Sequence, residues 1–171
     1  MKRMTSAFAS KLIKQLTEEK SYWSSKEREG YVYKVATDEE AFIPDYDYEE
    51  VSAILEGIDT KMRIIKHAIN RNNVLNEVQV GDEMMTIDSI LVKMSQLNNR
   101  KNMLDMMRKQ PEKSRVNLAL FGKNMAQEYQ YVNYDLEKVK ADFEKISDEI
   151  MSMQIALDRY NQTFEFDVDI D

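Results

Sequence analysis

The fold is decided by the stretch from residue 48 to residue 69, which reads YEEVSAILEGIDTKMRIIKHAI. Its apolar residues are spaced alternately by three and four positions, which is the repeat of an amphipathic helix with a heptad seam. The seam residues are Tyr48, Val51, Leu55, Ile58, Met62, Ile65 and Ile69. We expect Asn70, Asn72 and Asn73 to end this helix, because asparagine tolerates the capping conformation.

The same pattern returns 88 positions later. Its seam residues are Leu136, Val139, Phe143, Ile146, Ile150, Met153, Leu157 and Tyr160. The match continues past the seam, where Arg71 meets Arg159 and Asn73 meets Asn161. It predicts an internal pseudo-two-fold repeat within a single helical domain, residues 1–171. The predicted units are residues 5–80 and 86–168, each built as helix, strand, helix, strand, with Asn161 closing the last helix. The alternative is a coincidence between two heptad patterns.

Two further helices complete the expected helical set. The first begins at Thr5 or Ser6 and ends before Gly30, which is placed as a left-handed C-terminal cap. The other runs over residues 87–109 with Thr86 as its N-cap, and Pro111 ends it. The sequence therefore predicts a mainly α fold of the α+β class. Long antiparallel coiled-coil-like helices form a bundle in it, with a few short β-strands.

Short alternating or β-branched stretches mark the strands. Residues 31–35 (YVYKV), 77–80, 129–132 and 164–169 are typical strands, and Gly81-Asp82 is typical of a turn. In the last stretch Phe164, Phe166 and Val168 alternate with acidic residues, which predicts one apolar and one polar face. Residues 118–121 fit a strand or a short helix.

The composition restricts the classes of function. The 171 residues include 43% hydrophobic and 32% charged residues but only 4 glycines and 2 prolines, a profile of long helices. The net charge of −7 argues against nucleic acid and anionic membranes as partners. The absence of Cys and the single His remove thiolate chemistry and most metal sites. No apolar run is long enough to span a membrane, so we expect a cytoplasmic protein. We also expect no cofactor and no metal.

The order of these features resembles a known group of proteins. A long helix ends in Ile69-Asn70-Arg71-Asn72-Asn73, and Gly81 precedes another helix. An aromatic strand then leads to Asp135 and a last helix that ends in Leu157-Asp158-Arg159-Tyr160-Asn161. Over residues 45–170 this resembles the septicolysin-like family of small helical bacterial and prophage proteins. The resemblance implies a helix-rich fold with long paired helices, and it implies no established activity or catalytic residue. The segment 112–126 is longer here than the family's connection.

Clusters of charged residues have ordinary explanations. His67 has cations rather than carboxylates at helical spacing, so a surface histidine explains it better than a metal ligand. Acidic residues between positions 38 and 50 suit a helix N-terminus, and the alternative is a Ca²⁺ or Mg²⁺ site. A basic concentration between Arg100 and Arg115 suits a solvated helix end. No aromatic residue interleaves it, which argues against a platform that stacks nucleic-acid bases.

Three classes of function remain open. The preferred hypothesis is a non-enzymatic coiled-coil interaction or scaffolding protein that forms a homo-oligomer, with a dimer favoured. The alternative is a binding module for a small anionic ligand such as a nucleotide at the matched helix ends, through Arg71, Asn73, Arg159 and Asn161. An enzyme ranks last, because the sequence offers no combination of nucleophile and base. A dimer is favoured because the apolar faces of the two long helices are wider than a contact between two helices needs. The residues that widen these faces are Ile54, Ile64, Met151 and Ile155.

Overall fold

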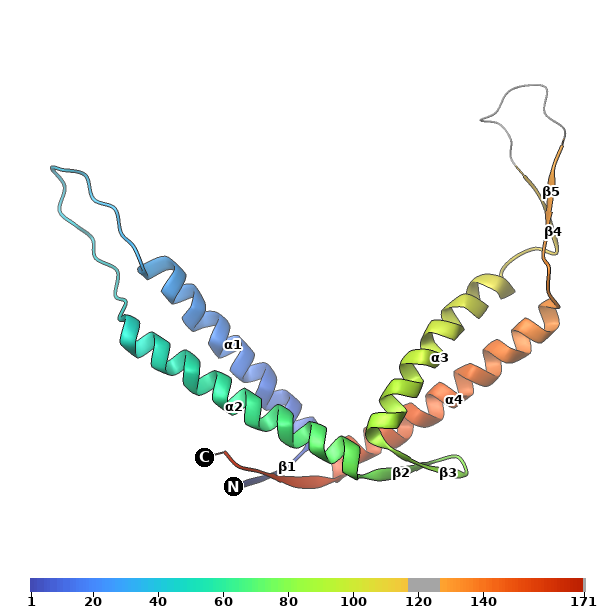
Figure 1. Cartoon of the computed structure of the whole chain (residues 1–171). Helices are drawn as coiled ribbons and strands as arrows, with labels where there is room; N and C mark the ends of the chain where they lie inside the picture. The colour runs from blue at the N-terminus through green and yellow to red at the C-terminus, as the bar shows by residue number, and fades with distance from the viewer. Residues whose placement is uncertain (117–126, 171) are drawn as a thin grey trace. The chain divides into compact units, whose positions relative to one another are not determined.

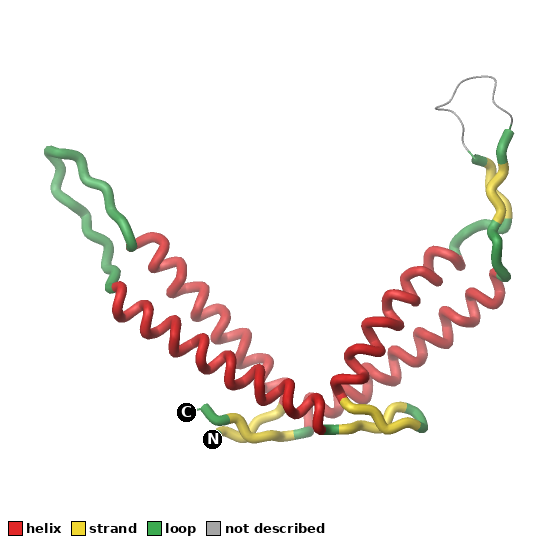
Figure 2. Tube along the Cα trace, viewed as in Figure 1, coloured by secondary structure: helices red, strands yellow, loops and turns green. Residues whose placement is uncertain are grey.

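The computed structural model describes residues 1–116 and 127–170. Its elements are β1 (Lys2–Thr5), α1 (Ser6–Gly30), α2 (Tyr48–Leu75), β2 (Glu77–Val80), β3 (Glu83–Thr86), α3 (Ile87–Arg108), β4 (Lys113–Arg115), β5 (Tyr129–Tyr131), α4 (Leu136–Thr163) and β6 (Glu165–Val168). Figures 1 and 2 show antiparallel helix pairs, α1 with α2 and α3 with α4. The mainly α fold class with a few short strands is confirmed. The predicted strand or helix at residues 118–121 lies outside the described residues.

Helix α1 begins where the sequence predicts and ends differently. The Thr5 hydroxyl accepts a hydrogen bond from the Phe8 N–H at 3.2 Å, which makes Thr5 the N-cap. The prediction of a left-handed cap at Gly30 is wrong, because Gly30 is the last helical residue and has no positive φ. Its role is steric: a Cβ at Gly30 would lie 2.5 Å from the Cβ of Tyr46. Glycine lets the chain return close to the end of α1.

Helices α2 and α4 have the same length and matching N-caps. Asp47 accepts a hydrogen bond from the Glu50 N–H at 2.8 Å, and Asp135 accepts one from the Lys138 N–H at 3.1 Å. The predicted C-terminal ends are too early, since Asn73 and Asn161 lie inside their helices. In α2 the helix continues to Leu75, where asparagine amides bond back to the preceding turn. These bonds run from Asn72 Nδ2 to the Ala68 carbonyl and from Asn76 Nδ2 to the Asn72 carbonyl, both at 2.8 Å.

The strands of the described residues form three two-stranded ribbons, β1–β6, β2–β3 and β4–β5. The β1–β6 and β4–β5 ribbons are antiparallel, and β2 and β3 are consecutive strands joined by a turn. The predicted strands at 77–80, 129–132 and 164–169 are confirmed to within a residue or two, and Gly81 turns the chain between β2 and β3 with a φ of 58°. The predicted strand at residues 31–35 is wrong, because that segment lies outside every ribbon. Strands β1, β3 and β4 were not predicted, since their sequences, KRMT, EMMT and KSR, do not alternate between apolar and polar residues.

The bounds of the elements repeat along the chain. Both α4 and β6 have the bounds of α2 and β2 shifted by 88 positions, and both β3 and the start of α3 follow β1 and the start of α1 by 81. Each copy therefore begins with a strand, and the predicted order of helix, strand, helix, strand is wrong. Strands β2 and β6 lie in different ribbons. Strands pair between the two copies: β1 of the first copy pairs with β6 of the second, and β2 of the first pairs with β3 of the second.

Contacts within the chain define two compact units, which are described separately. The first comprises Met1–Glu77 and Asp158–Asp171. Its core joins α1, α2 and both strands of the β1–β6 ribbon, and its buried residues are Met4, Ala9, Leu16, Ile58, Ile65, Ala68, Phe166, Val168 and Ile170. In β6 the apolar side chains are buried and Glu165 and Asp167 are exposed, as the alternation predicts. Cross-strand pairing places Arg3 Nε 3.0 Å from Glu165 Oε2.

The second unit comprises Val78–Leu157. Its buried apolar residues come from α3 and α4 and are Ile87, Ile90, Leu104, Val139, Met153 and Leu157. Val139, Met153 and Leu157 belong to the predicted seam of α4, which confirms that seam as an inward face. An ion pair between Lys93 Nζ and Glu149 Oε1 at 2.7 Å links the two helices. The glutamate hydrogen bond raises the pKa of Lys93, and partial burial opposes that rise.

Candidate functional site

The four residues proposed as an anion site lie on matching positions of α2 and α4. Arg71 and Arg159 are exposed, and Asn73 and Asn161 are half-buried inside the last helical turn. The amides that bond to helix carbonyls are those of Asn72 and Asn76 rather than Asn73. The helix ends are therefore polar, but the predicted asparagines do not cap them.

A buried tyrosine occupies the end of α4. Tyr160 is 5% exposed, and its ring stacks on Phe164 with centroids 4.8 Å apart. Burial raises the pKa of the Tyr160 phenol, and the nearby Asn76 amide partly offsets that rise. The end of α4 therefore carries a buried aromatic pair, whereas Arg71 and Arg159 face solvent.

A basic hollow lies along α1 and α2 in the first unit. It measures about 610 Å³ and is lined by Lys20, Asp59, Met62, Arg63, Lys66, His67 and Asn70. Lys20 Nζ lies 2.6 Å from Asp59 Oδ1, so this pair is neutralised internally. Arg63 and Lys66 remain as exposed cations, which gives the hollow a positive balance. The hollow could not be predicted from the sequence, because the pattern of α2 alone does not show that Lys20 lies across from Asp59.

His67 lies in this hollow among cations, as its helical neighbours predict. In the part of the chain that the structure describes, no group of three or more His, Asp and Glu side chains could hold a metal ion. The acidic residues between α1 and α2 are exposed. Only the Lys26–Asp45 contact at 3.7 Å ties one of them to α1 among the ion pairs of the described residues.

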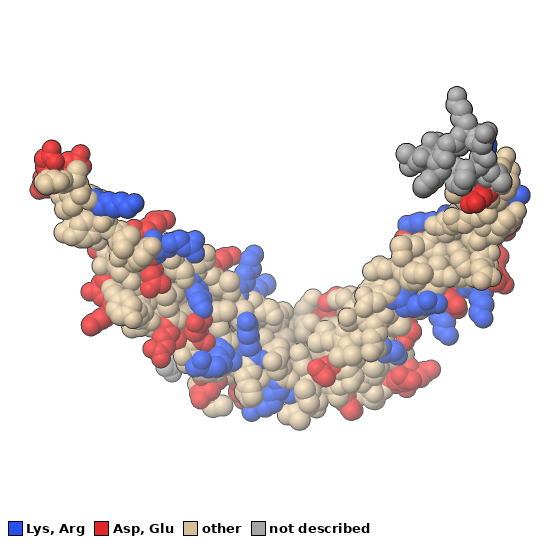
Figure 3. Space-filling view, turned by 45° about the horizontal axis from the view of Figure 1, so that its top comes forward, with Lys and Arg blue, Asp and Glu red and all other residues tan. Residues whose placement is uncertain are grey.

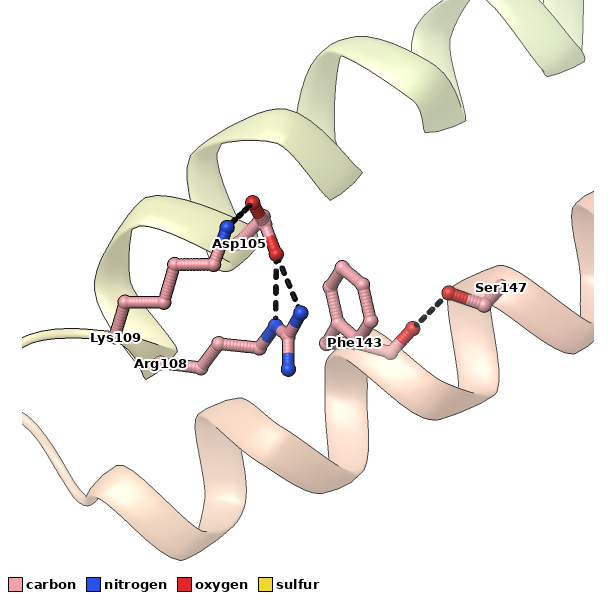
Figure 4. A network of polar contacts seen from close by, with 5 residues as sticks. All are labelled: Asp105, Arg108, Lys109, Phe143 and Ser147. Atoms are coloured by element: carbon pink, nitrogen blue, oxygen red, sulfur yellow. Dashed lines mark hydrogen bonds and ion pairs between the residues drawn. The ribbon is translucent and has the colours of Figure 1, made fainter.

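The basic residues at the end of α3 are held in a network that includes an aromatic ring (Figure 4). Arg108 Nη2 lies 2.6 Å from Asp105 Oδ1, and Lys109 binds the other carboxylate oxygen. These hydrogen bonds from Lys109 and Arg108 lower the pKa of the Asp105 carboxyl. The guanidinium of Arg108 lies 4.1 Å from the centroid of Phe143, a ring supplied by α4. The network therefore fastens α3 to α4.

The β4–β5 hairpin carries the remaining basic residues. Lys113 Nζ lies 4.2 Å from the centroid of the Tyr129 ring and 5.3 Å from that of Tyr131. The two rings are 44% and 61% exposed. The register pairs Lys113 with Tyr131 and Arg115 with Tyr129. The basic run contains no aromatic residue in the sequence, but strand pairing brings these two rings from a later segment beside Lys113.

The segment that joins α1 and α2, residues 31–47, is here called the acidic connector. All residues from 31 to 43 are exposed, including Tyr31, Val32, Tyr33, Val35, Phe42 and Ile43. Figure 3 shows acidic side chains gathered at its tip. Its base is anchored where Tyr46 Oη donates to Glu27 Oε1 at 3.4 Å. Burial and the neighbouring Glu27 carboxylate raise the pKa of Tyr46.

The apolar residues that motivate a dimer divide into two groups. Ile54 and Ile64 pack against the core of the first unit, so they are not available to a partner. Met151 and Ile155 are each 63% exposed and stand one turn apart on α4. The additional apolar residues of α2 are thus packed inside the first unit, whereas those of α4 remain exposed to solvent.

Comparisons with known proteins identify the fold alone. No protein-family model matches the chain, and no curated protein matches it. A solved structure described as a functionally unknown conserved protein from Corynebacterium diphtheriae is similar to it, with a TM-score of 0.67 and 16% sequence identity. The similarity covers 97% of this chain and 100% of that one. Membership of the septicolysin-like family stays a prediction.

The membrane question has a limited answer. None of the helices in the described ranges is both long and apolar enough to cross a membrane. A cytoplasmic location stays a prediction.

Proposed function

We propose that this chain is a non-enzymatic interaction protein that associates with a second copy of itself to form a dimer. The observation that supports this proposal most strongly is an apolar pair on α4, Met151 and Ile155, each of which is 63% exposed.

The exposed apolar residues of α4 supply an interface on a rigid element. Met151 and Ile155 point outward from the same face of the helix, because residues four apart are neighbours on a helix surface. Methionine adapts its shape to a partner at low cost. Burying both side chains in a dimer removes apolar surface from water, which is the main driving force of association.

The composition supports a role without catalysis. The chain has no thiol, and its one histidine is exposed among cations rather than placed beside a nucleophile or an acid. General acid–base and nucleophilic sites need such neighbours to adjust their pKa values. An interaction protein needs only stable faces, which the long helices provide.

Mutation of the α4 face tests the dimer. Light scattering of the wild-type chain at micromolar concentration should give about twice the mass of 20.2 kDa. The double variant Met151→Glu/Ile155→Glu should weaken association at least tenfold, because it places charges in an apolar interface. The matched control Ser152→Glu adds a charge at an exposed polar position of the same helix and should leave the mass unchanged. A monomeric wild-type chain would end the proposal.

The basic hollow favours a second candidate, the binding of a small anionic ligand such as a nucleotide. Arg63 and Lys66 line it, whereas Arg71 and Arg159 face solvent outside it. An anion that binds the folded state raises its stability by about 2.7 kcal/mol at 100 times the dissociation constant. The hollow is open, so the cations are accessible without rearrangement.

A thermal-shift series separates the two possible anion sites. Millimolar ATP or orthophosphate should raise the melting temperature of the wild-type chain, and Arg63→Ala/Lys66→Ala should abolish the shift. The double variant Arg71→Ala/Arg159→Ala should retain it. The reverse pattern would return the site to the helix ends, and no shift with either ligand would remove this candidate.

A further inference from the structure

Beyond the α4 face, the chain exposes an extended segment with strand-forming composition and no strand partner. Residues 31–35 read YVYKV, and tyrosine and valine are among the strongest strand formers. In the described part of the chain this segment belongs to no ribbon, and its side chains are all exposed. An exposed strand-like segment with free backbone N–H and C=O groups is a template for pairing with another strand.

The β4–β5 hairpin is complementary in backbone and in size. It pairs only three residues on each side, and neither strand has a second neighbour among the described residues. Isolated two-stranded ribbons are marginally stable in water, and a third strand makes them stable. The exposed rings of Tyr129 and Tyr131 also suit Tyr31 and Tyr33, because aromatic pairs across strands stabilise a sheet.

The charges of the two segments are opposite. The acidic connector holds five acids, Asp38, Glu39, Glu40, Asp45 and Asp47, against one lysine. The hairpin and the end of α3 hold four cations, Arg108, Lys109, Lys113 and Arg115, against three acids, Asp105, Glu112 and Glu128, which leaves a small positive balance. Opposite potentials steer two surfaces together and fix their register.

We propose that the acidic connector of one copy adds as a strand to the β4–β5 hairpin of a second copy. Each copy carries both members of the pair, so two copies can exchange connectors reciprocally and close as a dimer with two-fold symmetry. The backbone ladder supplies affinity, and the opposite charges select the partner. The inference rests on the proposed function only in that it requires self-association, because it uses a surface other than the α4 face.

A charge-exchange experiment tests this pairing. The acid-to-lysine variant is Asp38→Lys/Glu39→Lys/Glu40→Lys, and the base-to-glutamate variant is Lys113→Glu/Arg115→Glu. Within each variant the connector and the hairpin have the same sign of charge, so each alone should associate at least tenfold more weakly than wild type by sedimentation velocity. An equimolar mixture should restore association as a mixed dimer, because each connector then meets a hairpin of opposite charge.

Backbone chemistry gives an independent check. Val32→Pro removes an N–H donor from the connector and should weaken association at least fivefold. Helical circular dichroism and the melting temperature should stay near wild type in all these variants, since the altered residues are exposed. High salt should weaken the wild-type pairing, whereas it should leave an apolar contact at α4 intact.

The outcomes separate the two proposals. If the connector and hairpin variants associate as wild type while Met151→Glu/Ile155→Glu does not, the dimer stands and the strand pairing is overturned. If the mixture of charge variants fails to restore association, pairing between copies is overturned in favour of pairing within one chain or with a different protein. If the wild-type chain is a monomer at every concentration, both proposals fail.

Discussion

Ile58→Asp should unfold the first unit or cost it at least about 4 kcal/mol of stability. Ile58 is 5% exposed and belongs to the core formed with Leu16 and Ile65. The substitution removes an apolar side chain and leaves a carboxylate without a partner in its place. The loss is a large fraction of the stability of an ordinary domain. Urea denaturation followed by circular dichroism measures it.

His67→Asp is the matched control on the same helix. His67 is exposed and lies beside Lys66 and Arg63, so a carboxylate there stays hydrated and faces cations. Its effect should stay within about 0.5 kcal/mol. Equal denaturation midpoints for the two variants would show that the seam of α2 is not the buried face.

Val168→Asp should disrupt the β1–β6 ribbon together with the core beneath it. Val168 is 0% exposed, and it pairs with Lys2 in the register of the ribbon. A buried charge at this position should cost about 3–4 kcal/mol, because both strands of this ribbon contribute to the core of the first unit. Amide hydrogen exchange should show loss of protection in both β1 and β6.

The neighbouring position provides the control for Val168. Asp167→Asn changes an exposed side chain on the opposite face of β6, so it should alter stability by less than about 0.5 kcal/mol. If both variants kept the protection of β1, the pairing of the first and last strands would not contribute to stability.

The helices could be predicted from the sequence because their signals are local. Each signal involves residues that lie within a few helical turns of one another. Examples are the N-caps at Thr5 and Thr86 and the apolar seams of α2 and α4. The ends of α2 and α4 were less certain, since asparagine fits both a cap and a helical position from which its amide bonds back. Asn72 does the second, through its hydrogen bond to the Ala68 carbonyl.

Not all strands could be predicted from local sequence patterns, because a strand also depends on its partner strand. β1 was not predicted because Lys2–Thr5 gains its partner, β6, from the other end of the sequence. Residues 31–35 have the composition of a strand and lack a partner in the described chain, so propensity alone gave the wrong result. Gly30 likewise depends on a contact with Tyr46, which sequence spacing does not reveal.

The candidate sites follow the same rule. The positions of Arg71 and Arg159 on matched helices could be predicted, and both side chains are exposed. Neither the basic hollow nor the cation–aromatic contacts of the hairpin could be predicted, because each joins residues from two separate segments. Lys20 with Asp59 and Lys113 with Tyr129 are the pairs that create them.

The pairing of β1 with β6 also sets the order of events when the protein is made. A ribosome adds roughly 5–20 residues per second, so about 8–30 s separate the synthesis of Lys2–Thr5 from that of Glu165–Val168. Until then β1 has no partner strand, and Met4 lacks the Phe166 it faces in the register. The nascent chain therefore carries an unpaired β1 until Glu165–Val168 has been synthesised.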